Sequence, residues 1–184
     1  MKRLVHPSDL AKASHMRPGD PRIRLLTEVS GLKRLERFYN GIEDLKDLEF
    51  AAAVFRHLEL ELEVAPQDLE NIPREGGLIF VANHPYGAID GLALVNVLGS
   101  VRPDVKVMAN FLLQQLEPLK DRFIGVNPFE QLRSQSSFQG MRQAMEHVSE
   151  GHALAVFPAG EVSSWRTDLK AVADPRWKLP AIKM

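Results

Sequence analysis

Residues 78–83 read Leu-Ile-Phe-Val-Ala-Asn, a continuous apolar run that ends on a polar side chain. A strand covered on both faces needs such a run, so we predict a central strand here. Similar runs predict further buried strands at 105–109, 123–126 and 153–157. Helical patterns lie between them, at about 91–99, 111–116 and 136–149. This alternation predicts an α/β domain with a largely parallel or mixed sheet flanked by helices, whose ligand sites gather at the carboxyl ends of the strands.

The chain before this core has a different pattern. Apolar residues recur at helical spacing with Lys and Arg between them, which predicts a basic amphipathic helix over 22–39 that Gly41 closes. A second helix at about 43–57 would complete an N-terminal helical hairpin. Residues 58–64 alternate apolar side chains with Glu, which predicts a strand with one buried face near a sheet edge. We therefore divide the chain into residues 1–65, with the arm, hairpin and first strand, and an α/β domain over 66–184.

The composition is that of an ordinary globular protein. Of 184 residues, 45% are hydrophobic and 26% are charged, which excludes a collagen-like or disordered chain. Because the sequence contains no Cys, disulfides, thiolate metal sites and cysteine nucleophiles are excluded as well. No signal peptide opens the chain, and no apolar run approaches the roughly 20 residues of a membrane-spanning helix, so we expect a cytoplasmic protein.

The small net charge of −1 hides an uneven distribution. Residues 1–40 hold nine Lys and Arg against four Asp and Glu, whereas residues 41–184 hold fourteen against twenty. A nucleic-acid-binding domain usually spreads positive charge over one broad face, while a short basic arm on an acidic body suits an anionic surface. We therefore expect an anionic membrane surface as a partner, and no nucleic acid.

Polar clusters follow two of the predicted strands, at 83–91 and 157–164. Neither is a phosphate-binding loop, no Gly-x-Ser-x-Gly elbow occurs, and no His-x3-His pair supports a metal site. His84 ends a strand and Asp90 begins a helix, so the loop can bring the carboxylate to one imidazole nitrogen and leave the other as a general base. The alternative is that Asp90 only caps its helix and His84 is a structural residue.

These residues resemble a known family. Asn-His-Pro-Tyr-Gly-Ala-Ile-Asp-Gly at 83–91, the leucine-rich stretch at 110–120 and Phe-Pro-Ala-Gly-Glu-Val-Ser at 157–163 are similar to motifs of the glycerolipid acyltransferase superfamily. The closer likeness is to its hemolysin-like bacterial branch, and it runs from about Ile72 to the end of the chain. It implies that His84 and Asp90 are catalytic, with His84 as the base that deprotonates a hydroxyl or amine of a lipid precursor.

The same resemblance implies a substrate-binding set, which comprises Asn83, Gly87, Asn127, Arg133, Gly160, Glu161, Ser163 and Arg166. Two departures stand out. Five residues separate His84 from Asp90 instead of the superfamily's four, and Ala159 occupies the place of its usual Glu. Arg133 is the best substitute for the family's phosphate-binding Arg, with plain solvent exposure as its alternative. For Ser163 and Arg166, the alternative to head-group binding is a solvated loop.

The resemblance also implies co-substrates and a location. The acyl group would arrive as a thioester of acyl carrier protein or coenzyme A, with no metal or further cofactor, at the inner face of the cytoplasmic membrane. Relatives continue past the second motif into a further strand, so we interpret the chain as truncated, weakly active and able to self-associate through its uncovered side. The alternatives are a catalytically inactive lipid-binding or membrane-interaction module, and an esterase that uses the same pair on water.

Overall fold

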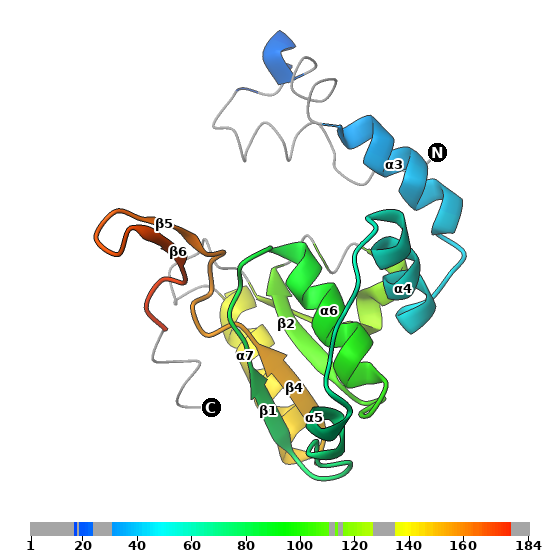
Figure 1. Cartoon of the computed structure of the whole chain (residues 1–184), viewed down its shortest axis with the longest axis vertical. Coiled ribbons are helices and arrows are strands. Elements are labelled where there is room, and N and C mark those ends of the chain that lie inside the picture. The colour runs from blue at the N-terminus through cyan, green and yellow to red at the C-terminus, as the bar shows by residue number, and fades with distance from the viewer. Residues whose placement is uncertain are drawn as a thin grey trace. The chain divides into compact units, whose positions relative to one another are not determined.

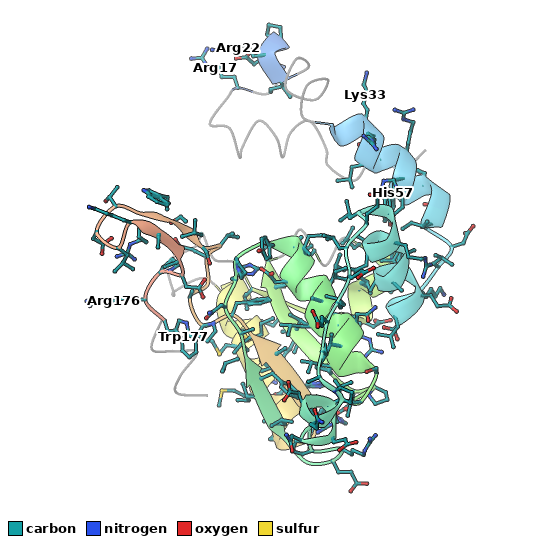
Figure 2. The ribbon with its side chains drawn as sticks, viewed as in Figure 1. Arg17, Arg22, Lys33, His57, Arg176 and Trp177 are labelled. Carbon is teal, nitrogen blue, oxygen red and sulfur yellow. The ribbon has the colours of Figure 1, made fainter. Side chains whose placement is uncertain are left out.

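The computed structural model describes residues 17, 19–23, 31–110, 113, 116–126 and 135–177. They belong to two compact units, residues 1–46 and residues 47–184. The first unit contains helix α3 (Leu32–Ile42), and its cations include Arg17, Arg22 and Lys33 (Figure 2). Residues 24–30 of the predicted helix 22–39 lie outside the described residues. Gly41 does not close α3, which continues to Ile42, because a helix tolerates an interior Gly at a cost of only about 1 kcal/mol.

The second unit is built on a parallel four-stranded sheet. Its strands are β1 (Leu78–Val81), β2 (Lys106–Asn110), β3 (Phe123–Val126) and β4 (Ala153–Val156), in the order β1-β4-β2-β3. The pairing runs from Leu78 opposite Ala153 to Val81 opposite Val156 on one side of β4. On its other side, Lys106 of β2 lies opposite Leu154. The predicted α/β fold with a largely parallel sheet is confirmed.

Helices cover both faces of this sheet (Figure 1). Helix α6 (Ala88–Gly99) packs on β2, and α7 (Gln135–Ser149) packs on β3 and β4 from the opposite face. Helix α4 (Asp47–His57) packs on α6, so it forms an outer layer. The core under α7 consists of Ile124, Ala144, Leu154 and Val156, all at most 4% exposed. Burial of each large apolar side chain stabilises the fold by about 1.5–3 kcal/mol.

Two predictions about strands are wrong. Residues 78–83 were expected to form a central strand, but β1 lies at an edge of the described sheet, and Val81 is 52% exposed. An apolar run shows that a strand is covered, whereas its place in the sheet depends on which other strand it pairs with. The strand that lies in the middle with all four residues buried is β4.

The second wrong prediction is the alternating strand at 58–64, which is neither helix nor strand. Its first residues instead end α4: Glu59 adopts a φ of 54°, and the N–H of Leu60 donates to the carbonyl of Phe55 at 3.0 Å. This bond, five residues back, is the mark of a Schellman motif. Leu58, Leu60 and Leu62 stay 39–43% exposed, so neither face of the alternating pattern is buried against the sheet.

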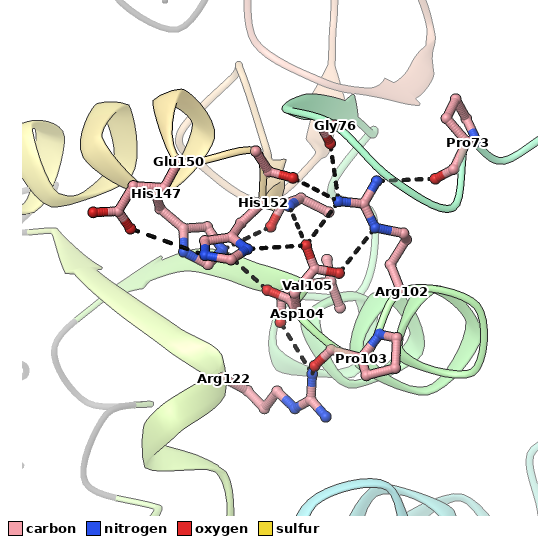
Figure 3. Close-up of polar contacts among 12 residues, drawn as sticks. Pro73, Gly76, Arg102, Pro103, Asp104, Val105, Arg122, His147, Glu150 and His152 are labelled. Atoms are coloured by element: carbon pink, nitrogen blue, oxygen red, sulfur yellow. Dashed lines mark hydrogen bonds and ion pairs between the residues drawn. The ribbon is translucent and has the colours of Figure 1, made fainter.

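A polar network holds the amino ends of β2 and β4 together (Figure 3). Arg102, only 1% exposed, donates hydrogen bonds to the carbonyls of Pro73, Gly76 and Gly151. It also donates to both carboxylate oxygens of Asp104, at 2.9 and 2.7 Å. The Arg102 guanidinium therefore holds the pKa of the Asp104 carboxyl well below its usual range. The ring nitrogen Nε2 of His147 lies 3.0 Å from the carbonyls of Asp104 and Ala153.

The described part of the second unit also contains four short elements. Helix α5 (Pro66–Glu70) precedes β1, and the 3-10 helix η2 (Glu117–Arg122) leads into β3. Strands β5 (Ser164–Arg166) and β6 (Ala171–Ala173) form an antiparallel hairpin apart from the four-stranded sheet (Figure 1). The sequence patterns did not predict this hairpin. Arg176 and Trp177 follow it at the end of the described chain (Figure 2).

Candidate active site

His84 follows β1 at the carboxyl edge of the parallel sheet, where ligand sites of such sheets gather. Its ring nitrogen Nδ1 lies 3.0 Å from carboxylate oxygen Oδ2 of Asp90, so the contact expected from the loop length is present. The two side chains are 18% and 13% exposed. They are therefore largely shielded from water but not fully buried.

The start of α6 explains how Asp90 reaches His84. Gly87 is the N-cap residue, with φ 67° and ψ −126°. Residues other than glycine rarely adopt this backbone conformation. Asp90 is therefore the third residue of the helix and not its N-cap. Its Oδ2 instead accepts a hydrogen bond from the N–H of Tyr86 at 2.8 Å, in addition to the contact with His84. The loop thus orients the carboxylate by its own backbone.

The second polar cluster packs against the first through Phe157. This residue follows β4, and because β4 pairs with β1, its ring stacks on the His84 imidazole with centroids 4.0 Å apart and planes at 21°. The stack covers one face of the imidazole and limits its rotation. Gly160, with φ 69°, then turns the chain, and its N–H donates to the carbonyl of Phe157 at 2.9 Å.

The hydrogen bonds determine which nitrogen of His84 can act as a base. Since the Asp90 carboxylate only accepts hydrogen bonds, Nδ1 carries the proton, and the lone pair belongs to Nε2. Among the residues that the structure describes, none hydrogen-bonds Nε2. The arrangement can therefore take a proton at Nε2 from a bound hydroxyl or amine, while Asp90 stabilises the imidazolium that forms.

The other predicted site residues are distributed unevenly. Asn83 and Glu161 are exposed near the site, and the Gly87 position lies against the side chain of Val162 in the second cluster. Arg166 lies on β5 and donates two hydrogen bonds to Asp168, both at 3.1 Å. The Ser163 hydroxyl donates to Oδ1 of Asp174. Asn127 and Arg133 lie outside the described residues.

Sequence reasoning missed two side chains that contact His84. The motif at 157–163 contains Phe157 but does not indicate that its ring meets His84, and the predicted site residues do not include Asp174. The N–H of His84 donates to the Asp174 carboxylate at 3.2 and 3.3 Å. The pairing of β1 with β4 would have indicated Phe157, but no motif or spacing in the sequence points to Asp174.

Two further observations concern metal binding and membrane spanning. In the described ranges, no three His, Asp or Glu side chains are grouped so that they could hold a metal ion. Among the helices that the structure describes, none is both long enough and apolar enough to cross a membrane.

Comparisons with known proteins agree with the motifs. The acyltransferase family model matches residues 18–184. A lyso-glycine lipid O-acyltransferase of Bacteroides thetaiotaomicron is 32% identical over 157 residues, which are 85% of this chain and 55% of that protein. A protein of the same name from Phocaeicola vulgatus is 35% identical over 158 residues, or 85% of this chain and 53% of the relative.

The chain thus spans about half the length of the curated relatives that it matches. No solved structure matches it significantly. The family match covers both motif clusters and nearly the whole chain, and it confirms the resemblance seen in the sequence. On this evidence, the chain belongs to the acyltransferase family.

Proposed function

We propose that the chain transfers a fatty acyl group from a thioester to a hydroxyl of a lyso-lipid, with His84 as general base and Asp90 as its orienting carboxylate. The observation that carries the proposal is the 3.0 Å contact between Nδ1 of His84 and Asp90, which leaves Nε2 available for the acceptor. The names of the two relatives support a lyso-lipid as acceptor and a hydroxyl as the acylated group.

The proposed reaction uses His84 of this chain and two substrates, the acceptor and the acyl thioester. Nε2 of His84 takes the proton of the acceptor hydroxyl as its oxygen attacks the thioester carbonyl. The tetrahedral intermediate then collapses, the carbon–sulfur bond breaks, and the imidazolium returns the proton to the departing thiolate. The products are an ester and a free thiol, and His84 ends neutral as it began.

Each neighbour of His84 supports one part of this cycle. The Asp90 carboxylate stabilises the imidazolium between the two proton transfers, and the ring of Phe157 holds the imidazole plane so that Nε2 keeps its direction. Acyl carrier protein and coenzyme A are the two donor carriers we propose, since both present the acyl group as a thioester.

The test combines purified protein with acyl-carrier-protein and coenzyme A thioesters and a panel of acceptors. Lyso-glycine lipid, lysophosphatidic acid and glycerol 3-phosphate separate the acceptor classes. Thiol release and mass spectrometry of the lipid product report transfer. We expect His84→Ala to lower the rate by about 100- to 10,000-fold, the usual contribution of a general base. The melting temperature should stay nearly unchanged.

The matched control is His152→Ala, which removes a half-exposed histidine at the opposite end of the sheet. This variant should transfer at the wild-type rate. Transfer that survives in His84→Ala would contradict the proposed base. Binding of the lyso-lipid without any thiol release would favour the lipid-binding module, and thiol release without a lipid product would favour an esterase.

We also propose that the basic N-terminal unit associates with an anionic membrane surface at the inner face of the cytoplasmic membrane. Exposed Lys33, Arg34 and Arg37 of α3 support this, because each cation near an anionic leaflet contributes about 1 kcal/mol. Co-sedimentation with anionic vesicles at low salt should show binding that high salt reverses. Binding that survives replacement of all three cations by Gln would contradict this proposal.

A further inference from the structure

Both backbone polar groups of His84 are bound by residues that flank the β5–β6 hairpin. Its N–H donates to the two carboxylate oxygens of Asp174, which directly follows β6, at 3.2 and 3.3 Å. Its carbonyl accepts from the N–H of Ser163, which directly precedes β5, at 2.8 Å. The Ser163 hydroxyl donates to Asp174 and closes the set. The base of the hairpin and the main chain of His84 thus form one hydrogen-bonded unit.

The hairpin itself offers little other packing. Its two strands have three residues each, and the cross-strand pair Trp165 and Val172 is 63% and 62% exposed. Because an isolated two-stranded hairpin is only marginally stable in water, the bonds at its base matter for its attachment. A bond from a backbone N–H to a carboxylate is charge-assisted and stronger than one between neutral groups.

The same bonds restrict the conformation of His84. The residue follows β1, which lies at an edge of the sheet in the part of the chain that the structure describes. Its imidazole contacts Asp90 and Phe157 at the same time. With its N–H bound to Asp174 and its carbonyl bound to Ser163, the backbone of His84 has little freedom to rotate. The side chain then leaves the backbone in the direction that both ring contacts require.

We propose that Asp174 is a positioning residue of the candidate active site, which holds the main chain of His84 so that the imidazole stays in contact with Asp90. The inference rests on the proposed function for its effect on rate, but not for its effect on the histidine ring. Asp174 binds the backbone of His84 and has no role in the proton transfer itself. Ser163 assists by binding both Asp174 and the carbonyl of His84.

The test compares Asp174→Ala, Asp174→Asn and Ser163→Ala by ¹⁵N NMR of the histidine rings and by steady-state kinetics. In wild-type protein the His84 ring should give the signature of the Nδ1–H tautomer. Asp174→Ala should give a mixed-tautomer signal, and kcat should fall by about 10- to 100-fold, the effect of a small misplacement, with KM within about twofold. Asp174→Asn keeps one acceptor oxygen, so it should restore part of the Nδ1–H tautomer signal and part of kcat.

Asp168→Asn is the matched control, because Asp168 lies on the same hairpin and is 60% exposed. It should leave the NMR signature and kcat unchanged. Ser163→Ala removes one hydroxyl and keeps the backbone bond to His84. It should change the tautomer signal and kcat in the same direction as Asp174→Ala, but to a smaller degree. It therefore tests the hydrogen-bonded unit if Asp174→Ala fails to fold.

The proposal is overturned if folded Asp174→Ala keeps the wild-type tautomer signals and the wild-type kcat. If that variant does not fold, the same result in Ser163→Ala overturns it. If wild-type protein shows no acyl transfer, the NMR comparison still decides the positioning role. The two failures are therefore distinguishable.

Discussion

The two ends of the parallel sheet use polar side chains in opposite ways. At the amino ends of β2 and β4, Arg102 is 1% exposed and directs its hydrogen bonds to three backbone carbonyls and to Asp104. At the carboxyl end of β1, His84 and Asp90 are partly exposed, and Nε2 of His84 keeps its lone pair for a ligand. One end of the sheet therefore binds the fold together, and the other leaves one group available for a ligand.

The largest expected effect comes from breaking the amino-end network. Arg102→Met keeps most of the buried stem but removes the guanidinium, so Asp104 and three backbone carbonyls lose the hydrogen bonds that Arg102 donates. We expect the free energy of unfolding to fall by about 3–5 kcal/mol, the usual cost of breaking a buried pair. Urea denaturation measures it.

The control for that prediction is Arg142→Met, which removes an Arg that is 79% exposed and pairs with Glu146 on the surface of α7. It should change the unfolding free energy by less than about 0.5 kcal/mol. Equal losses in the two variants would show that the Arg102 network does not stabilise the fold.

A second prediction concerns the packing of α7 on β3. A Cβ at Gly140 would lie 2.2 Å from the carbonyl oxygen of Gly125 in β3, so Gly140→Ala forces two backbones apart. The loss should be about 1–3 kcal/mol, which exceeds the gain in helix propensity of about 1 kcal/mol. Thermal and urea unfolding measure whether the free energy of unfolding falls or rises.

Gly41→Ala is its matched control, since Gly41 also lies in a helix and a Cβ there meets nothing within 4 Å. That variant should be neutral or slightly stabilising. Stabilisation of both variants would mean that α7 moves away from β3 at no cost.

A third prediction separates activity from stability at the carboxyl end. Phe157→Leu removes the ring that stacks on His84 at 4.0 Å but keeps an apolar side chain. We expect acyl transfer to fall about tenfold, or about 1.4 kcal/mol in the barrier, because the imidazole gains rotational freedom. Phe157→Tyr keeps the ring and should retain most of the rate. Equal rates in the two variants would show that the stack does not orient His84.

The smallest expected effect is a pH dependence at the amino end. Burial lowers the pKa of His147 from its ordinary value of 6.5, so the unfolded chain binds a proton there more readily than the folded one. Stability is then complete above pH 6.5 and falls as the pH drops from there toward the folded pKa. The loss should be below about 1 kcal/mol because solvent screens a half-buried group.

His147→Gln keeps an N–H donor for the two carbonyls but cannot titrate. Urea midpoints at pH 7 and pH 5 should differ less in this variant than in the wild type. A variant that loses as much stability on acidification as the wild type would remove His147 as the cause. The lowered pKa of Asp104 adds a further loss only at lower pH, below its ordinary value of 3.8.

Local sequence patterns were sufficient to predict a strand where the residues could bury their side chains in only one way. The apolar run at 123–126 is strand β3 with the predicted bounds, and the run at 153–157 is β4 with one residue fewer. The run at 58–64 also has a strand-like pattern, but it does not form a strand. Its alternation would need a neighbouring strand to pair with, and its first residues are used to end α4 instead.

The sequence by itself determined the α/β class, the family, and the contact between His84 and Asp90, because only five residues of loop and helix start lie between the two. Only the tertiary structure decided that β1 lies at a sheet edge, that Phe157 stacks on His84, and that Asp174 binds the backbone of His84. The physical reason is distance along the chain. Asp174 lies 90 residues after His84, and no local preference specifies a contact that depends on how the strands pair and where the hairpin attaches.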